Sequence, residues 1–371
     1  MTTRDLDREQ WHRQLLQRER ELSVEEAVEL AGGLYSTAPT SYLSCVARIP
    51  GFSRADLDRA LYEDRTLVRI GTLRGSGFLI PIDRIDMVMS AGDRKEWYAS
   101  AVDKIVGEKQ RKAWTERVVR ILDGNVLPAR EIRARLGVSG KEAEALRYLL
   151  SSLSQQRLVA AAAGPTSWRD NQYGYALWDQ WFPDHPAVQL DPEEARLELA
   201  RWYLQGHGPG TIEDFSWWSG LKKANARKAL EGVAQPHDGF YDLNPPADLP
   251  EPSGLRLLPI WDTALVTQKT RRRMVAEDLY PYVYDSSGNV TSTVMLDGEV
   301  IGVWDRGGDN ERLEVKAAFF AGSGPRGLVE EEAGRIGGAL GLAEVSVRQV
   351  DRYVDLTEAS RNRFMSPLSG D

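Results

Sequence analysis

The sequence predicts an α+β protein with three tandem winged helix-turn-helix motifs followed by a β-rich C-terminal domain. A helix–turn–helix order recurs along residues 23–250, and a strand follows each of the first two copies. The chain then changes to short apolar runs separated by glycine turns, which is typical of strands. A chain of 371 residues is long enough for several domains. We expect four, at residues 1–110, 111–190, 191–250 and 251–371.

The first motif follows a leading helix, which is expected within residues 5–22. Ser23 and Glu26 form a capping box, which predicts a helix that runs to Leu30. Gly32 ends this helix because glycine adopts a left-handed backbone easily. Two more helices and the two strands of a wing are expected, in this order, at residues 41–49, 54–64, 66–70 and 77–81.

The second and third motifs repeat this order. In the second, three helices and a strand are expected at residues 113–122, 129–137, 138–156 and 157–163. In the third, helices are expected at residues 193–208, 211–220 and 221–233. The neighbouring Trp217 and Trp218 are interpreted as core of the third motif, because other apolar residues lie near them at helical spacing. The alternative for this pair is stacking on a base.

The β-rich domain begins after residues 234–254. That segment carries five prolines, so we interpret it as a connector and not as a folded element. Strands are then expected in the runs at 254–266, 280–285, 290–307, 312–322 and 344–350, with a helix at 329–342. Asp262, after the first apolar run, is expected to tie this domain to a backbone amide or an arginine.

Composition excludes several classes of protein. No run of eighteen apolar residues exists and the start of the chain is charged, so we expect a cytoplasmic protein without a membrane span or secretion signal. The single Cys45 excludes an internal disulfide, and four scattered histidines offer no zinc site. No phosphate-loop or dinucleotide motif is present, so we expect neither metal nor cofactor. With a net charge of −8, any surface for nucleic acid must be confined to one face.

Several short motifs carry a family resemblance through their order and spacing. They are Gly32-Gly33-Leu34 with Pro39 and Ala47-Arg48, and the segments 56–61, 67–75, 206–221, 257–262 and 296–304. In this combination the chain resembles the AlkZ and YcaQ family of DNA glycosylases. The resemblance implies three winged helices and a β domain that form a C shape around a DNA-sized concave face.

The same resemblance implies an activity. Members of the family hydrolyse the N-glycosidic bond of bulky alkylated or crosslinked purines, in base excision repair or in resistance to DNA-alkylating natural products. Double-stranded DNA is then the expected partner, together with a DNA-alkylating small molecule or its adduct. No metal is expected to take part, and the protein is expected to be a monomer.

Basic residues on the predicted wing, recognition helices and one loop are the candidate DNA contacts. In the third motif, Lys223 and Arg227 share a helix face, so phosphate contact is one interpretation and a solvated surface charge is the other. The resemblance adds the loop of three consecutive arginines after residue 270. The full set is Arg69, Arg74, Lys141, Arg147, Lys222, Lys223, Arg227, Lys228, Arg271, Arg272 and Arg273.

The candidate catalytic residues are Tyr35, Ser36 and Thr37. At this place the family carries a Gln-apolar-Gln or Gln-apolar-Asp triplet that holds the attacking water, so this chain departs from the pattern. It also has Phe78 where the family often places a histidine on the wing. A hydroxyl of the loop can still orient water, but none stabilises an oxocarbenium-like state as a carboxylate does.

Two functions therefore stay open at this point. The first is a DNA glycosylase in which the loop positions water for the departure of a cationic alkylated base. The second is a catalytically silent member that binds DNA, regulates, or sequesters a reactive small molecule. In the second, Tyr35 packs at a helix end while Ser36 and Thr37 only bridge a loop. Glu29, on the helix before the loop, is the nearest carboxylate in sequence.

Overall fold

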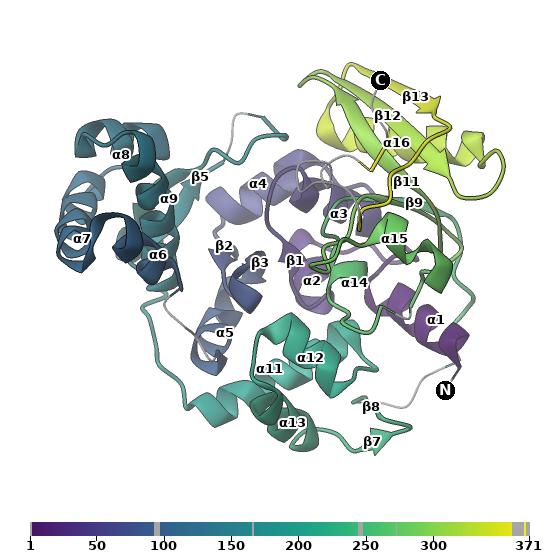
Figure 1. Ribbon diagram of the computed structural model, residues 1–371, viewed down its shortest axis with the longest axis horizontal. Helices are drawn as coiled ribbons and strands as arrows, with labels where there is room; N and C mark the ends of the chain where they lie inside the picture. The colour runs from purple at the N-terminus through teal and green to yellow at the C-terminus, as the bar shows by residue number, and fades with distance from the viewer. Residues whose placement is uncertain are drawn as a thin grey trace.

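The computed structural model describes residues 2–92, 97–164, 167–243, 248–271, 273–357 and 367–368. It is a mixed α+β structure in which three helical segments precede a five-stranded sheet (Figure 1). Each helical segment carries a small antiparallel sheet of its own. No helix in these ranges is both long and apolar enough to cross a membrane.

The first segment contains the expected helices and wing. Its elements are α1 (Thr3–Arg13), α2 (Val24–Leu30), β1 (Leu34–Tyr35), α3 (Thr40–Arg48), α4 (Arg54–Tyr62), β2 (Leu67–Gly71), η1 (Leu73–Gly75), β3 (Gly77–Pro81), η2 (Ile82–Arg84) and α5 (Ile85–Ala91). The capping box is confirmed, because Glu26 N donates to Ser23 Oγ at 3.1 Å and Ser23 N donates to the Glu26 carboxylate at 2.8 Å. The strands pair antiparallel in the order β1-β3-β2, which brings Tyr35 opposite Phe78.

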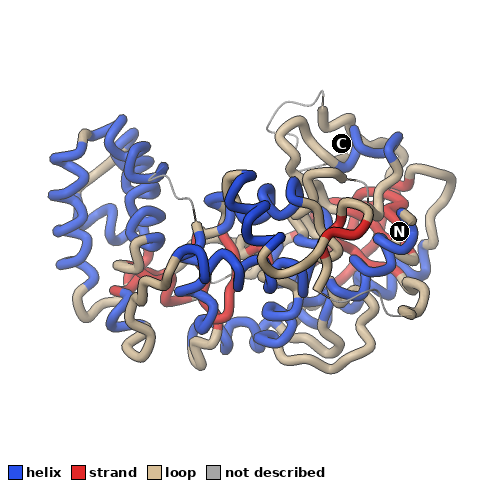
Figure 2. Tube along the Cα trace, turned by 90° about the horizontal axis from the view of Figure 1, so that it is seen from below, coloured by secondary structure: helices blue, strands red, loops and turns tan. Residues whose placement is uncertain are grey.

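The second segment forms one end of the molecule (Figure 2). Its elements are α6 (Trp97–Val106), α7 (Glu108–Leu122), β4 (Leu127–Pro128), α8 (Ala129–Leu136), α9 (Gly140–Gln155), β5 (Val159–Ala163), β6 (Gly174–Leu177) and α10 (Trp178–Trp181). Val102 of α6 lies in one hydrophobic cluster with Trp114 of α7 and Leu149 of α9. Helix α6 therefore packs with the helices that follow it in the chain.

The third segment continues with α11 (Pro192–His207), α12 (Ile212–Ser219) and α13 (Lys223–Glu231). Beyond α13, strands β7 (Pro236–His237) and β8 (Phe240–Tyr241) form an antiparallel hairpin. The expectation of an unfolded connector over 234–254 is therefore wrong at its beginning. The hairpin turns at Asp238 and Gly239, which both have positive φ and so allow a tight reversal.

The C-terminal part is built on a sheet in the order β13-β12-β11-β10-β9, parallel only between β12 and β13. Its elements are β9 (Leu255–Leu258), α14 (Thr263–Val266), η3 (Glu277–Leu279), α15 (Tyr280–Val283), β10 (Thr293–Leu296), β11 (Glu299–Gly308), β12 (Arg312–Phe319), α16 (Arg326–Leu340) and β13 (Glu344–Gln349). The expectation of a strand at 280–285 is wrong, because Tyr280–Val283 form α15. Pro281 stands in the first turn of α15, where its fixed φ favours a helix start.

The first segment and the C-terminal part share one hydrophobic core. Leu34 and Leu43 of the first segment lie in the same buried cluster as Leu255, Leu257 and Ile336. Helix α3 is covered on this side by β9 and α16, which lie beside it in Figure 1. The first segment and the C-terminal part are therefore packed as one unit.

A buried ion pair joins the same two parts. Arg48 of α3 and Asp262, the N-cap of α14, are both fully buried. Arg48 Nη2 donates to Asp262 Oδ1 at 2.6 Å and Nη1 donates to Oδ2 at 2.9 Å. Asp262 also accepts hydrogen bonds from Ser44 Oγ and from the Ala264 amide. The expectation that Asp262 ties the β domain to an arginine or an amide is confirmed on both counts.

Candidate nucleic-acid interface

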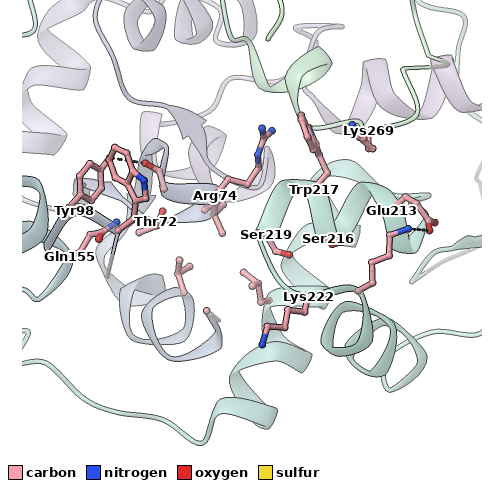
Figure 3. Close-up of a pocket in the computed structure, with 18 residues that line it drawn as sticks. Thr72, Arg74, Tyr98, Gln155, Glu213, Ser216, Trp217, Ser219, Lys222 and Lys269 are labelled. Atoms are coloured by element: carbon pink, nitrogen blue, oxygen red, sulfur yellow. Dashed lines mark hydrogen bonds and ion pairs between the residues drawn. The ribbon is translucent and has the colours of Figure 1, made fainter. Parts of the chain in front are cut away.

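A groove of about 960 Å³ lies where the three helical segments meet. It runs between the wing tip at 72–75, the start of α6, the end of α9, and the turn between α12 and α13. In Figure 3, Tyr98 and Gln155 stand on one side of it, Trp217 and Lys222 on the other, and Arg74 between them. This volume is large enough for a ligand of nucleotide size or more.

Arg74 fixes the wing of the first segment against the third. Its backbone is left-handed, with φ of +54°, and its guanidinium carbon lies 3.4 Å from the centre of the Trp217 ring. Gly220 lets the two segments approach, because an added Cβ there would meet Arg74 N at 3.1 Å. Burial lowers the pKa of Arg74 from its usual value. The guanidinium is thus held in one orientation over an aromatic face.

Trp217 and Trp218 face different ways although they are neighbours in sequence. Trp218 is 1 % exposed and packs against Trp202 in the core, as expected. The same expectation is wrong for Trp217, which is only partly buried and lines the groove. Its Nε1 donates to Val266 O at 3.0 Å, and Lys269 Nζ lies 4.4 Å from its ring centre. Adjacent helical residues point about 100° apart, so only one ring can enter the core.

Two aromatic rings, Trp97 and Tyr98, line the opposite wall, and Tyr148 packs against both. The Trp97 ring lies edge-on to Tyr98 at 4.8 Å and to Tyr148 at 5.6 Å, measured between ring centres. Tyr98 is held in place because its hydroxyl donates to Gly75 O at 3.0 Å. Trp97 keeps 59 % of its surface exposed, which is high for so large an apolar side chain.

The Tyr35–Thr37 loop lies behind the wing tip. Tyr35 is stacked on Trp261 at 5.4 Å and packs against Phe78 at 5.5 Å. Burial raises the pKa of the Tyr35 phenol above its usual value, while Ser76 and Arg74 oppose that shift. Ser36 N donates to Gly77 O at 3.0 Å, which extends the wing pairing by one residue. Tyr35 is therefore a neutral phenol at neutral pH.

Thr37 has the one loop hydroxyl that is buried without a hydrogen-bond partner among the described residues. The backbone next to it is clamped by Asn171, whose Oδ1 accepts from Ala38 N at 2.7 Å while its Nδ2 donates to Ala38 O at 3.0 Å. A buried hydroxyl without a partner costs free energy, so it is a natural place for a water or a substrate atom to bind.

The four basic residues of the third segment divide into two pairs. Lys222 and Lys223 line the groove, and Lys223 Nζ lies 3.0 Å from the carboxylate of Glu213. Arg227 and Lys228 lie outside the groove lining and pair with the exposed acids Glu231 and Glu193. Helical spacing correctly grouped these cations but could not tell which two would face the groove.

The other predicted cations lie in different environments. Lys141 and Arg147 are exposed on α9, and the guanidinium carbon of Arg147 lies 5.1 Å from the Tyr148 ring centre. Arg271 is partly buried over the ring of Tyr284 at 4.8 Å. Arg272 lies outside the described residues. Among those that the structure describes, Lys141 and Arg147 are the two exposed cations, as a residue that contacts a phosphate must be.

Two predicted DNA contacts are buried. Arg69 is 7 % exposed and lies over the Tyr173 ring at 4.7 Å. Arg273 is 2 % exposed and donates to Gln10 Oε1 at 3.1 Å and to Pro209 O. Arg69 belongs to β2 and Arg273 to the segment between α14 and η3, and neither guanidinium reaches the surface in this structure. The composition of the two arginine-containing segments gave no sign of this burial.

Sequence reasoning missed several residues of the groove. They are Thr72, Trp97, Tyr98, Gln155, Glu213 and Lys269. Trp97-Tyr98 could have been noticed, since two adjacent aromatics follow a run of charged residues. Glu29 does not reach the loop, because it pairs with Arg84 at 2.6 Å. Within the described ranges no three His, Cys, Asp or Glu side chains form a group that could hold a metal ion.

Comparisons with known proteins agree with this architecture. A family model described as DNA glycosylase AlkZ-like matches residues 28–339. An interstrand DNA cross-link repair glycosylase of Streptomyces sahachiroi is 26 % identical over 320 residues, which covers 77 % of this chain and 82 % of that protein. The solved structure of the S. sahachiroi DNA glycosylase AlkZ superposes with a TM-score of 0.70 at 23 % identity, over 94 % of this chain and all of that one. The last match shows a shared fold.

Proposed function

Because the chain belongs to the AlkZ-like DNA glycosylase family, we propose that it binds duplex DNA and hydrolyses the N-glycosidic bond of bulky alkylated or crosslinked purines. The observation that carries this proposal is the groove, which brings cations and aromatic rings together. Residues 35–37 do not line it, but Arg74 of its lining lies close enough to Tyr35 to act on the pKa of that phenol. Cations neutralise backbone phosphates and aromatic rings take up exposed bases. The relative from S. sahachiroi that acts on interstrand cross-links supports the choice of lesion. We propose that the protein acts as a monomer on the adduct of a DNA-alkylating small molecule.

The architecture supports the same proposal. We infer that each helical segment is a winged helix, in which the hairpins β2–β3, β5–β6 and β7–β8 are the wings. The three would then surround a concave face on which the groove lies (Figure 1). Because α6 packs with α7 and α9, we propose that the second domain begins near residue 97. The third domain would begin near residue 190 and the β-rich domain near residue 250.

The proposed reaction needs little help at the leaving group. An N-alkylated purine is cationic, so when the bond between C1′ and the base breaks, the electron pair neutralises the base. Water then adds to C1′ of the sugar and releases one proton to solvent, because residues 35–37 include no base that would take it. The loop would position this water, with the unpaired Thr37 hydroxyl as its first partner and the neutral phenol of Tyr35 as its second. No carboxylate is present in the loop to stabilise the oxocarbenium-like state.

A Thr37→Val variant is expected to lose most base excision without losing stability. Valine has the same shape but lacks the hydroxyl, and the removal of an unpaired buried hydroxyl should leave the free energy of unfolding unchanged or raise it by up to about 1 kcal/mol. Loss of one positioned water partner should slow excision by roughly 10²-fold. The measurement is single-turnover incubation with an N7-alkylated duplex, followed by alkaline cleavage of the abasic sites.

The conservative Thr37→Ser variant serves as control, since it keeps the hydroxyl and should retain excision within a few fold of the wild type. If Thr37→Val excises as fast as the wild type, the assigned role of Thr37 is wrong. If the wild type itself gives no strand scission above a protein-free control on small or bulky adducts, the glycosylase proposal fails.

The structure also favours a second candidate, a silent DNA-binding member of the family. Tyr35 and Ser36 are used for packing and strand pairing. Of the groove-lining residues that the structure describes, Glu213 alone has a carboxylate, and it is engaged by Lys223. Such a protein would bind damaged DNA, act as a regulatory DNA-binding factor, or sequester a reactive small molecule. Salt-sensitive duplex binding without any excision is the result that would select it.

Both candidates predict electrostatic binding to duplex DNA. A Lys222→Gln variant should bind several-fold more weakly at low salt, and the slope of log affinity against log salt should fall in magnitude by about one, as expected for one lost phosphate contact. Fluorescence anisotropy over a salt series measures both quantities. Lys112→Gln is the matched control, because Lys112 is an exposed lysine of α7 outside the groove lining. Equal slopes for the two variants would remove Lys222 from the interface.

A further inference from the structure

The groove has aromatic side chains on both of its walls. Trp97 and Tyr98 stand at the start of α6 and Trp217 on α12. In Figure 3, Tyr98 and Trp217 lie on opposite sides of the space, with Arg74 between them. Trp217 is already covered by Arg74 and Lys269, whereas Trp97 exposes more than half of its surface. An aromatic ring left open in a groove is a stacking surface for another flat ring.

The charge of the groove points to phosphates next to that ring. Among the described residues of its lining, Arg74, Lys222, Lys223 and Lys269 stand against the single carboxylate of Glu213. Glu213 is satisfied by Lys223 at 3.0 Å, and hydrogen bonding by this lysine lowers the pKa of the Glu213 carboxyl. Neither Arg74 nor Lys269 forms an ion pair with a carboxylate of the described residues. The wall opposite Trp97 is therefore cationic overall, as a nucleic-acid backbone requires.

A third feature of the groove is a hydrogen-bonding group without a partner. Thr72 is 8 % exposed and lines the groove at the wing tip, and its hydroxyl is buried without a partner in the described part of the chain. Since an unpaired buried hydroxyl is costly, its presence at a ligand-sized space indicates a polar group supplied from outside. The edge of a nucleobase, or a phosphate oxygen, supplies such a group.

From these three features we propose that the groove binds one unpaired nucleotide of a DNA strand, with its base stacked on Trp97 and its phosphates next to the cations of the opposite wall. This proposal rests on the proposed function, because it names the form of DNA that the same surface takes. Inside a duplex both faces of a base are covered by its neighbours, so Trp97 can stack only on a base that has left the helix. The protein would then prefer DNA in which a base is already unpaired.

The test compares two fluorescein-labelled probes by anisotropy at one salt concentration. One is a fully paired duplex and the other is the same duplex with a single unpaired thymidine at its centre. The wild type should bind the second probe roughly tenfold more tightly, the factor that stacking of one base supplies. Trp97→Ala should lose this preference and keep its affinity for the paired duplex. Trp97→Phe should keep most of the preference, because phenylalanine still offers a ring.

Two controls make the outcome interpretable. Leu328→Ala, which removes an exposed apolar side chain from α16, should leave both affinities unchanged. The thermal unfolding midpoint of Trp97→Ala should fall by no more than a few degrees, because Trp97 is 59 % exposed and loses only its edge contacts with Tyr98 and Tyr148. Equal binding of both probes by the wild type overturns the groove proposal and leaves the proposed function standing. Binding of neither probe counts against the proposed function itself.

Discussion

Replacing Asp262 by alanine is expected to lower the free energy of unfolding by about 3–5 kcal/mol. The carboxylate of Asp262 is fully buried and accepts two hydrogen bonds from Arg48 and one from Ser44. Its removal leaves the Arg48 guanidinium charged in the interior without a counter-ion, and a charge of this kind cannot be neutralised by deprotonation. Urea denaturation followed by circular dichroism measures the change.

An exposed ion pair is the comparison for this result. Arg326 and Glu330 lie 2.8 Å apart at the surface of α16, so Glu330→Ala should leave the unfolding midpoint nearly unchanged. The double variant Arg48→Met with Asp262→Leu leaves no lone charge in the interior. Its loss of free energy of unfolding should therefore be smaller than the sum of the losses in the two single variants. If Asp262→Ala unfolds with the wild-type midpoint, the buried pair does not hold the two parts of the chain together.

The second large effect is on the pH dependence of stability. Burial, with the nearby charges of Arg48 and Arg273, lowers the pKa of His207 to about 3. In the unfolded chain His207 titrates near 6.5, so between pH 6.5 and 3 the unfolded state takes up a proton that the folded state refuses. Stability supplied by neutral His207 is therefore complete above pH 6.5 and is lost on acidification, by up to about 1.4 kcal/mol per pH unit.

Asp7 has the opposite effect on stability when the pH is lowered. Burial raises the pKa of Asp7 to about 6, although the Met274 amide donates to its carboxylate at 2.7 Å. Since the folded state holds this proton more tightly than the unfolded state, Asp7 adds stability as the pH falls from 6 towards 4. The two slopes offset each other in part near pH 5–6. When the pH is lowered from 6 to 5, the free energy of unfolding of His207→Gln should therefore rise, and that of Asp7→Asn should fall.

Urea midpoints at pH 6 and 5 for the wild type and both variants provide the measurement. The window lies above the range in which Asp262 and the other ion-paired carboxyls with lowered pKa take up protons. If His207→Gln follows the wild type through this window, the buried imidazole is not the group responsible.

The elements that were predicted correctly are those whose signals are local. The Ser23–Glu26 box and the glycine-bounded wing are complete within a few residues, and so are the alternating strands around Leu296. The failures occurred where a local signal was ambiguous. The aromatic run at Tyr280 alternates like a strand but begins with a helix-favouring proline, and the proline-rich segment after α13 hides a hairpin closed at Gly239.

The candidate site could be predicted only in outline. The sequence indicated which helices would carry cations, but the side that a residue faces depends on packing between segments far apart in the chain. Trp217 and Trp218 illustrate this, because the same local pattern sends one into the groove and the other into the core. Arg69 and Arg273 illustrate the reverse, since each is charged and each is buried.

The core shared by the first and last parts of the chain has a consequence during biosynthesis. Helices α1 to α4 leave the ribosome first, but the side of α3 that packs on β9 and α16 stays uncovered until those elements are made. About 190 residues separate Leu61 from Leu255, which at roughly 5–20 residues per second corresponds to roughly ten to forty seconds. During that interval the nascent chain presents Leu43 and its neighbours to solvent, where a chaperone that binds apolar segments would find them.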